Sequence, residues 1–129
     1  MFDPTIQQVS ADERGEIYVV NLPDDRELVL LHSVKGSQRG GHSHNVDEVV
    51  VLLSGKMAYH KRSGSSRETM EVMHAGDSSF NNAGLIHMAV FLEDSWVMEQ
   101  KLAKKGEWEN QNYQPWRSKV TASSQEVAK

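Results

Sequence analysis

The stretch GSQRGGHSHNVDEVVVLLSG, residues 36–55, joins a glycine-rich polar segment to the most strand-like run of the chain. His42 and His44 stand two residues apart, and Glu48 follows with the same parity at the start of the apolar run. Side chains two apart in a strand point to the same face, so both imidazoles can point inward. Two imidazoles and a carboxylate make half of a nitrogen and oxygen site for a divalent transition metal. The stretch therefore predicts one wall of a metal site, against the alternative of a polar loop that contains histidines.

A mononuclear site needs a further ligand from elsewhere in the chain. His87 is the candidate, because it begins the apolar run IHMAVFL (86–92) directly after the turn residues NNAG (81–84). The remaining histidines, His32, His60 and His74, lie in other strand-like runs, where we expect surface or core positions away from the site.

Short apolar runs separated by turn residues fill the middle of the chain, at 17–22, 27–34, 48–53, 56–61, 68–74, 78–80, 86–92 and 95–102. Seven or eight strands at this spacing predict an all-β, antiparallel sandwich or barrel. The run 48–53 is apolar at every position after Glu48, which predicts a central strand covered on both faces. We expect residues 36–45 to form the loop before it.

The composition limits the classes of function. A chain of 129 residues with 38% hydrophobic and 25% charged residues predicts one globular domain. The net charge of −4 argues against nucleic acid as a partner, and the lack of cysteine excludes disulfides, thiolate metal ligands and a cysteine nucleophile. No apolar run approaches the roughly 20 residues that span a bilayer, and the N-terminal residues show no signal-peptide pattern. We expect a soluble, cytoplasmic protein with no membrane partner.

Residues 36–55 resemble the first sequence motif of the cupin family. Every fixed position of that motif is present, as Gly36, five residues, His42-x-His44, three residues, Glu48, six residues and Gly55.

A second segment resembles the second cupin motif, through Gly76, Gly84 and His87 at the expected spacings. Asn82 stands where the family often has proline, and Phe91 where it often has asparagine. Neither position is a metal ligand in the family pattern, so the departures concern the turn and the pocket rather than the ligands.

The resemblance implies a single-domain cupin over residues 1–129, a double-stranded β-barrel of the jelly-roll type. The barrel core would span about 15–103, followed by a mostly irregular and partly flexible segment, 104–129. It also implies one divalent metal ion, Fe, Mn, Ni or Zn, bound inside the barrel. The implied ligands are His42, His44, Glu48 and His87.

Three kinds of function are compatible with this resemblance. The first is a metal-dependent enzyme of the oxygenase, isomerase or lyase type that acts on a small polar molecule. The second follows from Arg39-Gly40-Gly41-His42-Ser43-His44, which resembles a segment of cupin-type nucleotide-sugar 3,4-ketoisomerases. In those enzymes histidines move protons without a metal, so His42 and His44 would be catalytic. The third is a non-catalytic module that binds a small ligand.

Two further residues are candidates for contact with the substrate. Arg39 is either a solvated loop charge or a bidentate donor to a substrate anion. Tyr59 lies in a strand-like run and is either a core residue or part of the barrel mouth.

Three aromatic residues, Trp108, Tyr113 and Trp116, stand in an otherwise polar C-terminal stretch. Aromatic side chains of this size are expected to pack against something, either over the barrel end or against a second subunit. They therefore favour a homodimer.

Overall fold

The computed structural model describes residues 2–63 and 67–113, which form eleven β-strands. The strands are β1 (Ile6–Asp12), β2 (Gly15–Leu22), β3 (Arg26–Ser33), β4 (Gln38–His44), β5 (Glu48–Ser54), β6 (Lys56–Ser63), β7 (Arg67–His74), β8 (Ser78–Asn81), β9 (Ile86–Phe91), β10 (Ser95–Lys101) and β11 (Asn110–Asn112). Within this part of the chain, no helix has the length and apolar character needed to cross a membrane.

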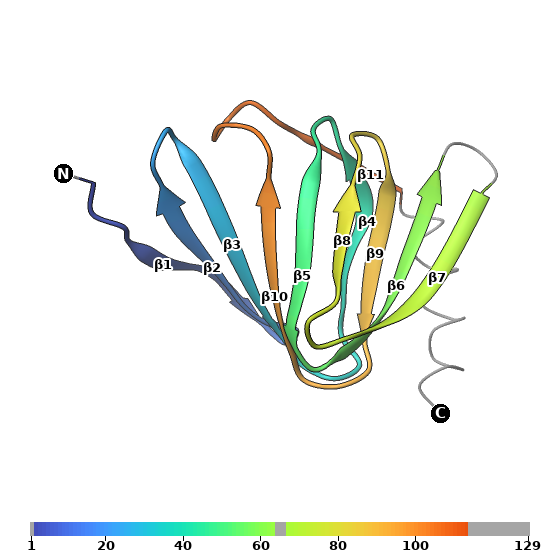
Figure 1. Ribbon diagram of the computed structural model, residues 1–129. Coiled ribbons are helices and arrows are strands. Elements are labelled where there is room, and N and C mark those ends of the chain that lie inside the picture. Colours follow the sequence, from blue (N-terminus) through green and yellow to red (C-terminus); the bar gives the residue numbers. More distant parts are fainter. Residues whose placement is uncertain (1, 64–66, 114–129) are drawn as a thin grey trace.

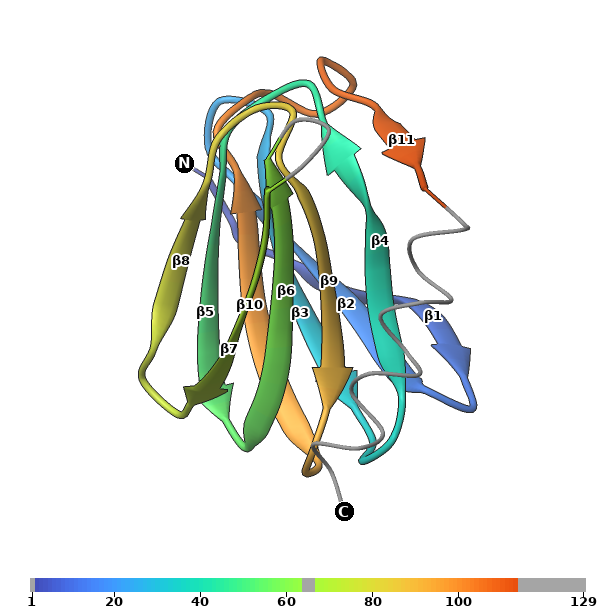
Figure 2. The same cartoon turned by 90° about the vertical axis from the view of Figure 1, so that its right-hand side faces the viewer.

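The strands form two antiparallel sheets that face each other (Figure 1 and Figure 2). One sheet has six strands in the order β1-β2-β3-β10-β5-β8, and the other has five in the order β11-β4-β9-β6-β7. The chain crosses between the sheets repeatedly, so that β10 lies between β3 and β5. This arrangement confirms the predicted all-β jelly roll.

The main hydrophobic core fills the space between the two sheets. Alternation along the strands selects its members: Met57 and Tyr59 of β6 point inward, while Ala58 between them belongs to a second cluster on the opposite face. The buried members of the inner cluster are Leu31, Val50, Leu52, Met57, Tyr59, Met73, Ala89, Phe91 and Val97.

The prediction that residues 48–53 are covered on both faces was wrong. Glu48, Val50 and Leu52 are buried, but Leu53 on the other face is 49% exposed and Val51 is only partly covered. β5 lies near one edge of its sheet, and no second layer of described residues covers its outer face.

Three strands were missed from the sequence. The polar stretch expected to be a loop contains β4, which pairs with β9 on one side and β11 on the other. β1 is exposed over most of its length, and β11 has three exposed residues, so neither shows apolar alternation. Their pairing with neighbouring strands, rather than the burial of their own side chains, holds them in place.

β4 contains an irregularity that decides which side chains face the barrel interior. Its pairing with β9 shifts between Gly40 and His42, as in a β-bulge, and Gly40 and Gly41 both have positive φ, 98° and 82°. Arg39 and His42 differ in parity and would point to opposite faces of a regular strand. Because the bulge adds one residue, Arg39 and His42 line the same cavity.

The bulge predicts that Gly40→Ala destabilises the protein. A Cβ at this position would lie 2.8 Å from the carbonyl oxygen of His87, on the backbone of β9. Gly36→Ala is the matched control, because Gly36 also has positive φ but would place its Cβ in open space. We expect urea unfolding to show Gly40→Ala to be less stable than Gly36→Ala by roughly 1–3 kcal/mol. Equal stabilities would show that the close approach of β4 and β9 imposes no constraint.

Candidate metal centre

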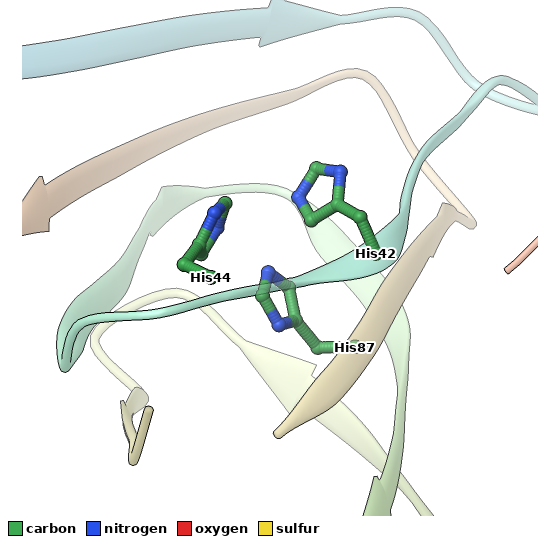
Figure 3. Close-up of side chains that lie close together, drawn as sticks. All are labelled: His42, His44 and His87. Atoms are coloured by element: carbon green, nitrogen blue, oxygen red, sulfur yellow. The ribbon is translucent and has the colours of Figure 1, made fainter. Parts of the chain in front are cut away.

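Three histidines from two neighbouring strands gather at one end of the barrel (Figure 3). His42 and His44 come from β4, and His87, the register partner of His42, comes from β9. The ring centroids lie 4.6–5.0 Å apart, and one potential ligand atom from each ring lies within 4.8 Å of the others. The structure thus brings together the three imidazoles that the sequence named as metal ligands.

Hydrogen bonds on the far side of two rings orient these imidazoles. His44 Nδ1 lies 2.5 Å from the Asn110 side-chain oxygen, and His87 Nδ1 lies 3.1 Å from the Leu85 carbonyl oxygen. Both partners are acceptors, so Nδ1 of each ring donates and Nε2 of each neutral ring carries a lone pair. This is the tautomer in which a histidine binds a metal through Nε2.

Glu48, the fourth predicted ligand, lies beside two of the three rings. Its side chain is fully buried, and its carboxylate oxygens lie 3.4 Å from His44 Nε2 and 3.4 Å from His87 Nε2. His44 Nε2 and His87 Nε2 are buried without a hydrogen-bond partner, and Glu48 Oε2 has only the ion pair with Lys101 at 3.2 Å. Acceptors that face one another in a buried site are unfavourable unless a cation lies between them. The donor set and its orphaned atoms therefore fit a divalent metal, or protons in its place.

Lys101 is a cation at this site that the sequence did not identify. Its Nζ lies 3.2 Å from Glu48 Oε2 and 4.1 Å from the centroid of the Trp108 ring. Burial alone would raise the pKa of Glu48, but His44, His87 and Lys101 outweigh it and lower this pKa to about 2. Glu48 is therefore ionised in the metal-free protein.

Two of the neighbouring imidazoles, those of His42 and His87, have lowered pKa values. Burial is the largest cause that lowers the pKa of His42, and the nearby His87 and His44 lower it further, to about 3. Burial also lowers the pKa of His87, although the charge of Glu48 opposes this effect. A neutral imidazole is the form that binds a metal, so no proton must leave these two rings at neutral pH.

A cavity of about 180 Å³ adjoins the cluster, and both His42 and His87 line it. Apolar side chains of the inner core form much of its wall, while four other polar side chains, Arg14, Arg39, Tyr59 and Glu99, also line it.

The two residues predicted to contact a substrate both line this cavity. Arg39 lies on a strand rather than in a solvated loop and is only 7% exposed. Tyr59 is buried, and its hydroxyl oxygen accepts a hydrogen bond of 2.8 Å from the side-chain nitrogen of Asn81. The same nitrogen lies 3.4 Å from Glu48 Oε1, so Asn81 connects Tyr59 to the candidate ligand.

The other histidines lie outside the cluster, as expected. His32 contacts Trp96 and bonds to Glu16 on the outer face of its sheet, and His74 is exposed near Asp77. His60 is buried, and the parity of β6 places it on the same face as Ala58, away from the barrel interior.

Two of the C-terminal aromatics pack against their own chain. Trp108 meets the ring of His44 edge-on at 5.6 Å, and Tyr113 packs against the outer cluster that contains Ala58 and Met88. Trp116 lies outside the described residues. Trp108 and Tyr113 therefore no longer argue for a second subunit, and the homodimer stays a prediction.

Sequence reasoning missed Lys101, Glu99, Asn110 and Asn81 at this site. Parity along SWVMEQKL could have found the first two, because Val97, Glu99 and Lys101 alternate toward the interior. No comparable pattern marks Asn110, because its position follows from the pairing of the short strand β11 with β4.

The bond to His44 predicts that Asn110→Ala weakens metal binding. Loss of a partner that orients a metal-binding histidine typically lowers the affinity by roughly 10–100-fold. Gln111→Ala, an exposed neighbour on the same strand, is the matched control and should bind as the wild type does. Competition with a chromophoric chelator measures both affinities. Unchanged affinity in Asn110→Ala would show that this hydrogen bond does not orient the ring for a metal.

The burial of Glu99 predicts that the free energy of unfolding of the metal-free protein falls as the pH rises. Burial, followed by the charge of Glu48, raises the pKa of Glu99 from 4.5 to about 7. A carboxyl whose pKa is raised on folding favours the folded state at low pH, and this contribution is lost as the pH rises from 4.5 through 7. With chelator present, Glu99→Gln should therefore gain stability over the wild type by roughly 1–3 kcal/mol at pH 8 and much less at pH 5.

Urea unfolding at the two pH values measures this difference. Glu109 is exposed, so Glu109→Gln is the control and should be as stable as the wild type at both pH values. A Glu99→Gln variant that shifts stability equally at pH 5 and pH 8 would contradict a raised pKa.

Comparison with protein-family models and with curated protein sequences finds no match for this chain. Solved structures with a similar fold do exist. The capsular polysaccharide assembling protein CapF from Staphylococcus aureus superposes with a TM-score of 0.70 at 15% identity, over 84% of this chain and 34% of its own. The chain thus spans about a third of the length of CapF.

Two further structures show the same fold. KdgF from Halomonas sp. superposes with a TM-score of 0.63 at 18% identity, over 76% of this chain and 89% of its own. A variant of the oxalate decarboxylase from Bacillus subtilis superposes with a TM-score of 0.65 at 16% identity, over 74% of this chain and 27% of its own. Together with the two facing antiparallel sheets, these similarities confirm the resemblance seen in residues 36–55: the chain is a protein of the cupin fold.

Proposed function

We propose that this chain is a metal-dependent enzyme that acts on a small polar molecule. His42, His44, His87 and Glu48 would hold one divalent transition metal ion, Fe, Mn, Ni or Zn. The adjoining cavity, which His42 and His87 also line, would hold the substrate. The reaction would be of the oxygenase, isomerase or lyase type.

The observation that carries this proposal is the pair of buried imidazole nitrogens that lie without hydrogen-bond partners beside the Glu48 carboxylate. His44 Nε2 and His87 Nε2 each face the Glu48 carboxylate at 3.4 Å, while their Nδ1 atoms are taken by Asn110 and Leu85. A fold that buries a carboxylate beside two imidazole lone pairs places a strong demand for a cation at that point. Three imidazoles and one carboxylate are a suitable donor set for the proposed ions.

A bound metal would polarise a substrate oxygen, acidify water or activate dioxygen, depending on its identity. The chain's own residues would prepare the site for this chemistry. Asn110 and Leu85 orient two of the rings, and Lys101 and Asn81 hold the Glu48 carboxylate. Tyr59, whose pKa burial raises well above 10, stays a neutral phenol at the cavity wall. One of the structures with a similar fold is named as an enzyme, the oxalate decarboxylase, which supports the choice of an enzyme.

The second candidate is a metal-free isomerase of the nucleotide-sugar 3,4-ketoisomerase type, in which His42 and His44 exchange protons with the substrate. An acid-base catalyst works best with a pKa near the working pH. Burial and the neighbouring imidazoles lower the pKa of His42 to about 3, so this ring is a weak base near neutral pH. Activity that survives exhaustive chelation would nevertheless favour this candidate.

A non-catalytic module that binds a small ligand is the third candidate, and tight binding without turnover under any metal would favour it. A homodimer and a cytoplasmic location remain predictions from the sequence. Measurement of the molar mass in solution tests the first of these.

The proposal predicts one metal ion per chain in the purified protein. His87→Ala should lower the metal content to a small fraction of this value, because it removes one of three clustered imidazoles. His74→Ala is the matched control, because this histidine is exposed and lies outside the cluster. Elemental analysis measures the content, and the element found narrows the chemistry: iron favours dioxygen reactions, zinc or nickel favours Lewis-acid catalysis.

A protein that holds no transition metal after growth and refolding with each of the four ions would refute the proposal. Equal metal content in His87→Ala and His74→Ala would refute the assignment of the ligands.

A further inference from the structure

Arg39 carries a buried positive charge that no acidic side chain neutralises at close range. Its side chain is on β4, only 7% of the residue is exposed, and it lines the same cavity as His42 and His87. Among residues 2–63 and 67–113, the nine ion pairs include none with Arg39. A buried charge without a counterion lowers the stability of the folded protein, so we expect an anion to bind beside Arg39.

The contacts of Arg39 hold the guanidinium in place but leave part of it unused. Nε donates to Ser33 Oγ at 2.7 Å, and Nη2 donates to the His32 carbonyl oxygen at 3.2 Å. These bonds use two of the five N–H donors of a guanidinium. Both acceptors are neutral, so they orient the side chain without balancing its charge.

Two other charged residues line the cavity, and neither replaces a ligand anion. Arg14 pairs with Asp12 at 2.7 Å, so its own charge is balanced and the carboxylate of Asp12 is engaged. Glu99 forms no ion pair with Arg39 within 4.0 Å among the described residues. Its charge therefore acts on the guanidinium only at longer range. Burial is the largest cause that lowers the pKa of Arg39, which is consistent with an unpaired guanidinium.

The rest of the cavity indicates what kind of anion would fit. Its apolar wall includes Leu31, Val50, Met57, Phe91 and Val97, all members of the inner core. The volume of about 180 Å³ is comparable with the roughly 150 Å³ apolar cavity that accepts benzene in an engineered protein. One guanidinium without an ion pair balances the single charge of a carboxylate better than the two charges of a phosphate dianion.

The two polar ends of the cavity are close enough for one small molecule to touch both. Arg39 pairs with Ala89 and His42 pairs with His87, and these partners are two residues apart on β9. Two residues of a strand span roughly 7 Å. A molecule with a short apolar body can therefore meet the guanidinium at one end and the histidines at the other.

We propose that Arg39 binds the carboxylate of a small substrate whose apolar body lies against the inner core and whose other end faces His42 and His87. This inference rests on the proposed function, since it names the substrate class of the same site. The guanidinium offers its free N–H groups to both carboxylate oxygens, as arginine commonly does. The preferred ligands are short monocarboxylates, aliphatic or aromatic.

Calorimetric titration of the metal-loaded protein with benzoate, hexanoate and the neutral isostere benzamide tests the proposal. We expect both carboxylates to bind, and benzoate to bind at least tenfold more tightly than benzamide. Arg39→Gln should lose at least tenfold in carboxylate affinity, with Arg39→Lys intermediate. Arg14→Gln is the matched control, because it removes the same charge from the same cavity at a residue already paired with Asp12.

Three results would overturn the proposal: equal binding of benzoate and benzamide to the wild type, no binding of either carboxylate, or tighter binding of inorganic phosphate than of both carboxylates. They need no variant, so they stand even if Arg39→Gln fails to fold. In a folded Arg39→Gln protein, unchanged carboxylate affinity would also overturn it.

Metal analysis of the same samples separates the two proposals. A wild type without metal refutes the proposed function. A wild type with stoichiometric metal, but without an Arg39-dependent preference for carboxylates, refutes this inference alone.

Discussion

The bulge in β4 is the constraint on which the candidate site depends. Arg39 and His42 would point to opposite faces of a regular strand. The shift of pairing between Gly40 and His42 brings both side chains to the same face. As a result, Arg39, His42 and His44 all face the barrel interior. Arg39 lines the cavity, and the histidine cluster lies beside it. The positive φ of Gly40 and Gly41, and the close approach of Gly40 to the backbone of His87, explain why two glycines stand there.

The site also depends on which groups surround it. The imidazole Nδ1 atoms of His44 and His87 are engaged from behind, so their lone pairs point toward Glu48. Lys101 and Asn81 approach the same carboxylate from neighbouring strands. The interior is thus polar and charged at the end with the histidines, while the apolar core occupies the rest of the space between the sheets and forms much of the cavity wall. Arg14, Arg39 and Glu99 are the charged side chains that line the cavity, and the proposed carboxylate would explain the role of Arg39.

Much of this arrangement was visible in the sequence. Strand alternation predicted most strands, and the spacing of His42, His44 and Glu48 singled out residues that the fold places together with His87. The sequence did not predict the features that depend on the pairing of strands rather than on composition. β4 was taken for a loop because its polar side chains face a cavity instead of a core, and β1 and β11 were missed because they are mostly exposed. Asn110 reaches the site through the register of β11 with β4, which no local pattern encodes, whereas the alternation along β10 could have placed Lys101 toward the interior.

The central claim is that the buried acceptors of His44, His87 and Glu48, together with His42, hold one metal ion. Anomalous diffraction from crystals of the purified protein, recorded on both sides of the absorption edge of the metal found, tests it most directly. The account predicts a single anomalous peak, bonded to the three imidazoles and to the Glu48 carboxylate. A peak elsewhere on the chain would contradict it, as would a site in which only protons or water lie between the rings and the carboxylate.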